Sequence, residues 1–253
     1  MVISHLIGNT SALVACSLVS HSWYTAAFPH RHNTLIASII SCGTNGRFMW
    51  PESLVQMSEL GFLPFVRKFQ IRKYCELHPG EVSPRLFDPC TLRHFSALTN
   101  VQQLRIDYLD IPSFVPKIQR YFGHFMPTVR SLALKNPKAN CRQLVYFIGL
   151  FEHLEDLKFL GFISRTYPFP EDDPRDGQGL IPPFVPPLRG RLTIMDSKAA
   201  DILDEMIDRF GGIRFRWVNL YKVHEIQPLL GPCAKTLETL RLYPAYPHGE
   251  ELL

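Results

Sequence analysis

The stretch Val101-Gln-Gln-Leu104-Arg-Ile106 decides the fold, because its spacing of three apolar residues recurs along the chain. The alternating end of such a phrase predicts a short strand whose apolar side chains face one way, and the first apolar residue fills the turn before the strand. Full copies begin at Val129, Leu154, Phe215 and Leu237, an earlier copy begins at Val66, and a looser one runs from Leu188 to Ile194.

The distances between these phrases indicate a repeat architecture. Phrases at residues 101, 129 and 154 start 28 and 25 residues apart, and those at 215 and 237 start 22 residues apart. Leucine-rich repeats have this period. Each phrase buries about three large apolar side chains, worth roughly 1.5 to 3 kcal/mol apiece, but only where a neighbouring copy covers them. We therefore expect a stack of repeats with insertions at the two longer intervals.

Composition excludes several classes of protein. The chain has 253 residues and is 46% apolar, which is enough for a continuous core, and its formal net charge of +4 is too small to argue for nucleic acid or an anionic membrane. Its six cysteines contain no Cys-x-x-Cys pair, so neither a zinc module nor a disulfide framework is indicated. A reducing compartment, cytoplasm or nucleus, is expected. The apolar run 144–150 is too short to cross a bilayer, and neither Lys nor Arg precedes Ala12 to make a signal peptide.

Helical patterns alternate with the strand phrases. Residues 114–125, 141–151, 197–210 and 223–230 each separate two phrases and carry apolar residues at helical spacing. Residues 34–40 predict a first strand, 43–46 a turn, and Pro51 to Gly61 a short helix. Ser197 and Gly211-Gly212 suit the start and end of their helix. The fold class expected is α/β, a leucine-rich-repeat solenoid of parallel strands with outer helices.

Two segments interrupt this rhythm. Residues 75–90 carry three prolines and predict a surface connection. Residues 162–187 predict a long loop insertion with acidic residues in its middle, either a partner-contacting loop or a solvated one. Asp172 and Asp176-Gly177 imitate part of a calcium loop, but Pro183 stands where the closing Glu belongs, which argues against calcium.

The N-terminal segment predicts a helix that begins with Ser11 as N-cap and closes at Pro29. One stripe of it carries Leu13, Cys16, Val19 or Ser20, and Trp23. Its plain interpretation is an amphipathic helix packed on the first repeat. His30 and His32 follow; they indicate an exposed basic tail more than a zinc site, because further ligands are missing nearby.

This segment also resembles the second half of an F-box. The segments that carry the resemblance are Leu13 to Trp23 and the basic, aromatic tail 26–32. Further segments, at residues 98–106, 121–125 and 236–242, are similar to segments of basidiomycete F-box proteins with irregular leucine-rich repeats. The resemblance implies a partial F-box-like segment at 1–33 and an irregular repeat domain at 34–253 with an insertion at 162–187. The chain begins at Met1 inside what would be the first F-box helix.

The resemblance implies a substrate-recognition subunit of a Skp, cullin and F-box ubiquitin ligase, which positions a protein substrate and makes no bonds itself. The helical end would dock a Skp-type adaptor. The alternative is a non-catalytic repeat scaffold, or a degenerate F-box paralogue that no longer binds the adaptor. The residues implied in adaptor binding are Leu6, Ile7, Leu13, Cys16, Leu18, Val19 and Trp23.

Enzyme signatures, including a phosphate-binding Gly-rich loop and His-Glu-x-x-His, are missing, so neither a catalytic residue, a cofactor nor a metal is expected. In a repeat of this kind, residues between the apolar strand positions point to the open concave side. Basic residues there outnumber acidic ones, Asp107 and Asp156, by seven to two. We expect an acidic or phosphorylated protein partner; the alternative is that the charges only solubilise the sheet. The residues predicted to contact it are Arg105, Lys135, Lys158, Arg191, Trp217, Tyr221, Arg241 and Tyr243.

Overall fold

The computed structural model describes residues 3–6, 9–31, 33–40, 57–74, 93–109, 111–161, 181–195, 200–221 and 231–243. The strands are β1 (Thr34–Ile40), β2 (Lys68–Tyr74), β3 (Gln103–Asp107), β4 (Ser131–Lys135), β5 (Asp156–Leu160), β6 (Arg191–Ile194), β7 (Trp217–Tyr221) and β8 (Thr239–Tyr243). The α-helices are α1 (Thr10–Ser17), α2 (His21–Arg31), α5 (Ile111–Phe122), α6 (Cys141–Ile148) and α7 (Ala200–Phe210). Short 3-10 helices are η1 (Ile3–Leu6), η3 (Leu63–Phe65), η4 (Arg93–Ala97) and η5 (Met126–Thr128).

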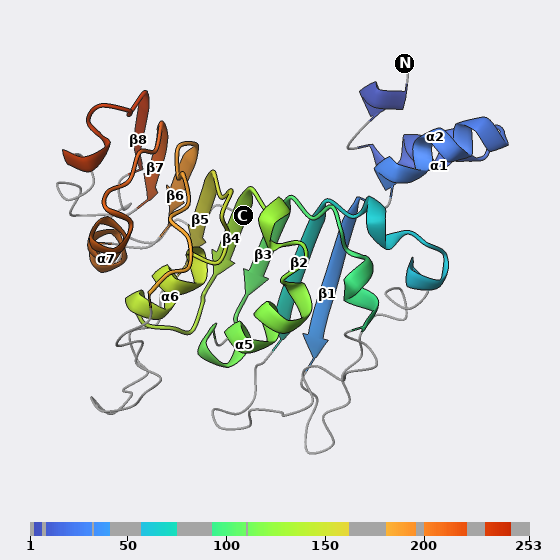
Figure 1. The fold of residues 1–253 in the computed structure, drawn as a ribbon. Coiled ribbons are helices and arrows are strands. Elements are labelled where there is room, and N and C mark those ends of the chain that lie inside the picture. The colour runs from blue at the N-terminus through green and yellow to red at the C-terminus, as the bar shows by residue number, and fades with distance from the viewer. Residues whose placement is uncertain are drawn as a thin grey trace. The chain divides into compact units, whose positions relative to one another are not determined.

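The eight strands form one sheet in chain order, β1 to β8 (Figure 1). Every pairing whose register is described is parallel. Consecutive parallel strands require a crossover connection, and helices supply it between β3 and β4, β4 and β5, and β6 and β7. The expected α/β fold with parallel strands is confirmed.

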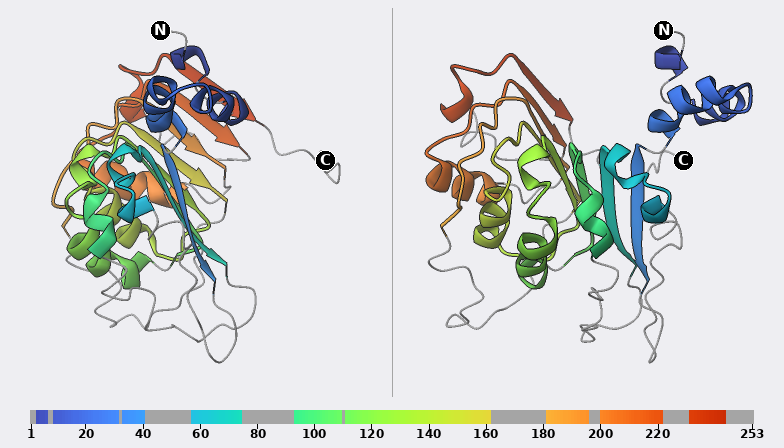
Figure 2. Two further views of the ribbon diagram at one scale, coloured as in Figure 1. Left: turned by 90° about the vertical axis from the view of Figure 1, so that its right-hand side faces the viewer. Right: turned by 45° about the vertical axis from the view of Figure 1, so that its right-hand side comes forward.

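Contacts divide the chain into two compact units. Unit 1 comprises Met1–Arg105 and Lys117–Thr128, and unit 2 comprises Ile106–Pro116 and Val129–Leu253. The domain boundary expected at residue 33 stays a prediction. In unit 2, α6 and α7 cover one face of β5 to β7 (Figure 2), which leaves the opposite face of these strands without a covering helix among the described residues.

The apolar phrases form the core where the sequence predicts strands. In six phrases all three apolar positions are at most 3% exposed, since each strand turns them toward the helices. The last phrase differs: Leu237 and Leu240 are half-buried and Leu242 is 52% exposed. The buried triplets are Val66, Phe69, Ile71; Val101, Leu104, Ile106; Val129, Leu132, Leu134; Leu154, Leu157, Phe159; Leu188, Leu192, Ile194; and Phe215, Val218, Leu220.

A recurring hydrogen-bond pattern joins neighbouring strands at their amino ends. We call the residue immediately before a strand its lead-in residue. The lead-in carbonyl accepts two consecutive backbone N–H groups from the start of the next strand, at 2.8 to 3.1 Å. This pairing holds each phrase at the same level as the one before it. The described residues that accept in this way are Asn33, Arg67, Arg130, Glu155, Gly190 and Arg216.

Several predicted helix ends are confirmed. Asn140 and Gln143 form a reciprocal capping box at the start of α6, so this helix begins where the apolar periodicity does. Gly211 and Gly212 follow α7 with φ of 66° and 118°, a left-handed conformation that glycine adopts without steric cost. Gly61, with φ of 69°, likewise ends the helical turn at residues 57–59. α5 lies three residues earlier than predicted at both ends.

The N-terminal helix departs from its prediction in three ways. Asn9, not Ser11, is the N-cap of α1, because its side chain accepts the Ala12 N–H at 3.0 Å. The single predicted helix is two helices, since the Ser20 hydroxyl accepts the Trp23 N–H and so caps a new start. Pro29 does not close the helix but lies within α2, whose last residue is Arg31. Near a C-terminus a proline removes only one interior hydrogen bond.

Other predictions lie outside the described residues. They are the turn at 43–46, the helix start at Pro51, the connection at 75–90, residues 162–180 of the insertion, the cap at Ser197 and the helix at 223–230. The end of the insertion is described: its Phe184 N–H donates to the Gly149 carbonyl at 3.0 Å, and Pro186 is buried.

Gly190 gives the first testable prediction. A Cβ added there would overlap the Glu155 carbonyl oxygen, which accepts the N–H groups of Gly190 and Arg191. Because the obstacle is backbone, Gly190→Ala should lower the free energy of unfolding by about 1 to 3 kcal/mol, measured by urea denaturation. Gly231→Ala is the matched control, since its Cβ would meet no atom within 4 Å. Equal midpoints for the two variants would contradict this close approach.

Candidate functional site

The uncovered face of β4 to β8, which we call the open strand face, carries most of the predicted partner-binding residues. Strand register sets them in three rows. Arg191 pairs with Trp217 in one row, and Tyr221 pairs with Tyr243 in another. Lys158 and Arg241 belong to the middle row, where Thr193 and Asn219 lie between them.

Aromatic side chains concentrate at the β7 and β8 end of the open strand face. Trp217 is 38% exposed and Tyr243 is 37% exposed. The rings of Tyr221 and Tyr243 stack, with centroids 4.0 Å apart and planes 2° apart. A side-chain hydrogen bond with Tyr243 raises the pKa of Tyr221, and the positive charge of Arg241 acts in the opposite direction. Exposed Trp and Tyr are residues on which protein interfaces often anchor.

The basic residues of this face differ in how far their charges are compensated. Lys158 Nζ lies 2.9 Å from an Asp156 carboxylate oxygen, and Ser131 donates to the same oxygen at 3.0 Å. Lys135 Nζ lies 5.5 Å from the centre of the Tyr108 ring. Arg191 and Arg241 are exposed, so the residues most accessible to an acidic partner are those nearest the aromatic end.

Asp107 and Arg105, also predicted on the open side, differ from these residues in burial or in the unit to which they belong. Asp107 is 1% exposed, so the prediction that it lies on the open side is wrong: β3 buries its last two residues instead of alternating to its end. Arg105 belongs to unit 1, whereas the other predicted partner-binding residues belong to unit 2. It is half-buried and makes interactions within the protein.

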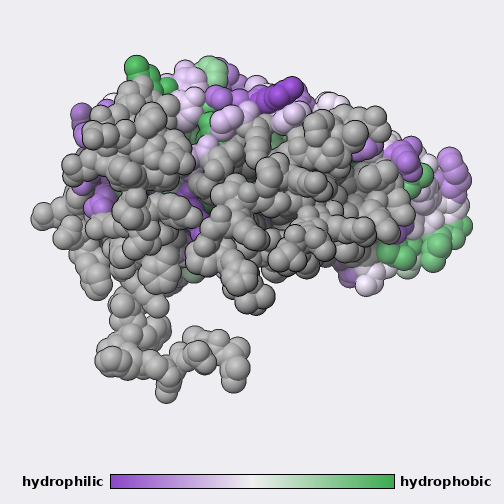
Figure 3. Space-filling view, turned by 90° about the horizontal axis from the view of Figure 1, so that it is seen from below, coloured by the Kyte–Doolittle hydropathy of each residue, from purple (hydrophilic) through white to green (hydrophobic). Residues whose placement is uncertain are grey.

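The residues predicted to bind an adaptor divide by exposure. Leu13 is 2% exposed and is part of the core. Leu6, Cys16 and Trp23 are half-buried. Ile7 lies outside the described residues. Leu18 and Val19 are 81% and 70% exposed in the turn between α1 and α2, where Figure 3 shows hydrophobic residues gathered at one end of the surface.

The turn between α1 and α2 is held from within the protein. The Leu18 and Val19 N–H groups donate to the carbonyls of Ala15 and Cys16, both at 3.1 Å. Arg31 Nη1 donates to the Ser17 hydroxyl at 2.8 Å, which ties the two helices together. The exposed Leu18 and Val19 side chains therefore project from a turn with a defined backbone.

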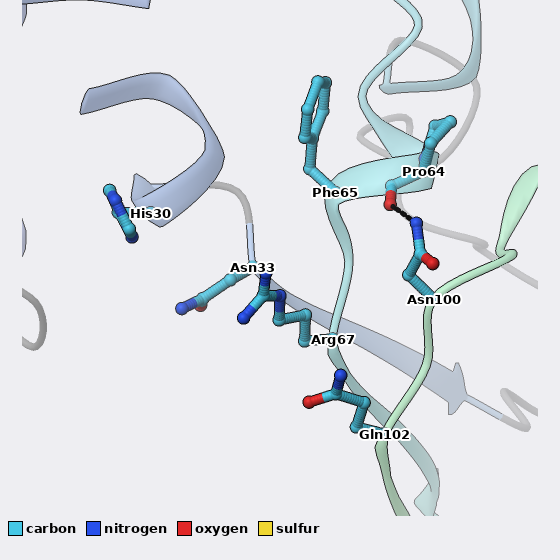
Figure 4. Close-up of a pocket in the computed structure, with 7 residues that line it drawn as sticks. All are labelled: His30, Asn33, Pro64, Phe65, Arg67, Asn100 and Gln102. Atoms are coloured by element: carbon cyan, nitrogen blue, oxygen red, sulfur yellow. Dashed lines mark hydrogen bonds between the residues drawn. The ribbon is translucent and has the colours of Figure 1, made fainter. Parts of the chain in front are cut away.

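A polar pocket in unit 1 was not predicted from the sequence. It has a volume of about 280 Å³ (Figure 4). His30, expected in an exposed basic tail, instead lies within α2, is half-buried and lines this pocket. The other polar residues of the pocket are Asn33, Arg67, Asn100 and Gln102. The sequence gives little indication of this pocket, because its lining residues come from segments up to 72 positions apart.

Metal binding and membrane insertion find no support in the described part of the chain. It contains no group of three or more His, Cys, Asp or Glu side chains that could hold a metal ion. None of its helices combines the length and hydropathy required to cross a membrane. The cysteines described, Cys16, Cys141 and Cys233, are free thiols, and burial raises the pKa of Cys233.

Three surface features are therefore described: an exposed strand face with aromatic and basic residues, an exposed apolar turn and a small polar pocket. Comparison with known proteins finds no matching family model, no matching curated protein and no matching solved structure.

Proposed function

We propose that the chain is a leucine-rich-repeat substrate-recognition subunit of a Skp, cullin and F-box ubiquitin ligase, and that it binds an acidic or phosphorylated protein on the open strand face. The observation that carries the proposal is the alignment of Arg191 with Trp217, and of Tyr221 with Tyr243, on the strand face that no described helix covers. Aromatic anchors beside accessible guanidinium groups suit carboxylate or phosphate ligands on a protein.

The repeat assignment rests on two recurring features. Six phrases bury the same three positions, and six lead-in carbonyls in the described residues each accept two N–H groups from the following strand. Leucine-rich repeats combine a buried strand phrase with a period in the range of these phrases. Thr128 and Thr236 make equivalent hydrogen bonds in two different repeats. Each hydroxyl donates to the backbone carbonyl of the first apolar residue of the preceding phrase, Val101 or Phe215.

The adaptor assignment rests on the turn between α1 and α2. Leu18 and Val19 together expose a large apolar surface on a turn whose backbone is hydrogen-bonded. Contiguous apolar exposure on a defined backbone favours a protein contact. This turn lies within the segment that resembles an F-box, so a Skp-type adaptor is the partner proposed for it.

A second candidate is a repeat scaffold that does not bind an adaptor. The observation that favours it is the burial of Leu13 together with the half-burial of Cys16 and Trp23. These side chains serve the packing of α1 and α2, and fewer of the residues implied by the resemblance are available to a partner. The two candidates share the open strand face and differ only at the helical turn.

Co-purification with a fungal Skp-type adaptor separates the two candidates. The wild-type chain should retain the adaptor, and Leu18→Asp should abolish retention, because a carboxylate would be desolvated in an apolar contact. Leu60→Asp is the matched control: it places the same charge at another exposed leucine of unit 1, 62% exposed, and should bind like the wild type.

Circular dichroism of each variant would show that the fold is retained. Failure of the folded wild-type chain to retain the adaptor would overturn the ligase assignment and favour the scaffold. Equal loss in both variants would show that the turn is not the contact.

A further inference from the structure

The lead-in residues of β1, β2 and β3 place three polar side chains on consecutive strands of unit 1. They are Asn33, Arg67 and Gln102. The backbone brings them together, because the Asn33 carbonyl accepts from Arg67 and Lys68, and the Arg67 carbonyl accepts from Gln102 and Gln103. All three line the pocket of unit 1.

Arg67 differs from the arginines that hold the same position in unit 2. Arg130 Nη1 lies 2.9 Å from a Glu155 carboxylate oxygen, and Arg216 Nε lies 3.6 Å from a Glu238 carboxylate oxygen. In each case the acid is the lead-in residue of the next strand. For Arg67 that position holds Gln102, an uncharged amide. The described residues give the Arg67 side chain neither an ion pair nor a hydrogen bond.

The pocket around Arg67 has a defined wall. α2 is anchored by Phe28, whose ring meets the Phe62 ring edge-on at 4.1 Å and the Phe65 ring at 5.8 Å. This packing brings His30, two residues later, to one side of the pocket (Figure 4). On the other side, Asn100 Nδ2 donates to the Pro64 carbonyl at 2.8 Å. Pro64 and Phe65 are the apolar residues of the lining.

The lining offers hydrogen-bond donors and one permanent positive charge. Asn33 Oδ1 accepts from the Thr34 hydroxyl at 2.9 Å, which leaves its amide NH₂ as a donor. Gln102 contributes a second amide, and the Arg67 guanidinium contributes a planar fork of N–H groups. None of the described residues that line the pocket is acidic. A guanidinium flanked by amides and without a carboxylate partner matches an anion supplied from outside.

We propose that this pocket binds a small organic monocarboxylate, whose carboxylate pairs with Arg67 and whose apolar part lies against Pro64 and Phe65. One guanidinium balances one negative charge, and its fork fits the two carboxylate oxygens. The volume of about 280 Å³ lies near the lower end of the range for small-molecule sites, which suits a metabolite-sized ligand. The pocket shares no lining residue with the open strand face or with the turn between α1 and α2.

The test uses 3-phenylpropionate as the probe, titrated into the full chain by calorimetry and by saturation-transfer NMR. The neutral 3-phenylpropionamide has the same shape and lacks the charge, so it should not bind measurably at the same millimolar concentrations. Arg67→Gln should weaken binding of the carboxylate about tenfold or more, because a charge-assisted pair is lost. Arg67→Lys should weaken it less, since the charge stays and the fork is lost.

Arg130→Gln is the matched control, because Arg130 holds the equivalent lead-in position and already pairs with Glu155. It should leave the affinity unchanged. Equal binding of the amide and the carboxylate, unchanged affinity in Arg67→Gln, or no binding of the carboxylate to the folded wild type would overturn the proposal. Tighter binding of phenyl phosphate than of the carboxylate would overturn the assignment to a monocarboxylate.

Discussion

Phe69→Ala should lower the free energy of unfolding by about 3 to 5 kcal/mol, the largest effect on stability that we expect from one substitution. Phe69 is 1% exposed and packs against three other aromatic rings in unit 1. Its ring centroid is 5.5 Å from that of Phe95, 6.0 Å from Phe122 and 6.1 Å from Phe125. Truncation to alanine would leave a cavity that rings held by η4 and α5 cannot fill by small movements.

Urea unfolding followed by far-ultraviolet circular dichroism measures this loss. A second probe, tryptophan fluorescence, is needed because a chain with two units can unfold in two steps. Phe65→Ala is the matched control: the side chain lies four residues earlier and is 40% exposed, so its loss should cost about 1 kcal/mol or less. Phe69→Ala with the stability of this control would show that the ring cluster is not the core of unit 1.

Trp217→Ala combined with Tyr221→Ala should abolish capture of the protein partner while the fold persists. Truncation of an anchoring aromatic residue at an interface costs about 2 kcal/mol or more, which corresponds to a loss of at least about 30-fold in affinity per residue. The fold should survive because Trp217 is 38% exposed and Tyr221 gives up mainly its stacking on Tyr243. That stacking is worth only about 0.5 to 1.5 kcal/mol.

Affinity purification of the tagged wild type and the double variant, quantified by mass spectrometry, measures the loss. Phe184→Ala, which removes an aromatic side chain that is 44% exposed and off the strands, is the matched control and should keep the partner. A folded double variant that captures the partner as well as the wild type would exclude the aromatic end of the open strand face as the contact.

Prediction of strands succeeds here because their signal is local and repeated. In Val129-Arg-Ser-Leu132-Ala-Leu134, the spacing alone predicts which side chains share a face, and all three apolar side chains are fully buried. The strand predicted at Thr34–Ile40 from a run of β-branched and apolar residues is likewise present, as β1. Alternation of burial fails at Asp107, the last residue of β3, which is buried like Ile106 before it.

Helix ends are predicted less well because several neighbouring residues can serve as caps. Asn9 and Ser11 are both suitable N-caps, and the chain selects Asn9, whose side chain reaches the Ala12 N–H. The apolar stripe from Leu13 to Trp23 is compatible with one helix. Ser20 begins a second helix instead, and Leu18 and Val19 are exposed in the turn as a result. The apolar periodicity does not reveal this break. The three residues between the two helices make up nearly one helical turn, so the apolar residues on either side keep almost the same spacing as in one continuous helix.

The sequence by itself determined which residues form the strands, that the strands are parallel and separated by helices, and which side of β4 to β8 carries the basic and aromatic side chains. Each of these properties depends on residues close together in the chain, whose periodicity expresses burial directly. Only the tertiary structure decided that Arg67 lies in a pocket with His30, Asn33, Asn100 and Gln102, whose described lining contains no acidic residue. That arrangement depends on strand register and on the packing of Phe28 against Phe62, contacts between distant segments that no local pattern records.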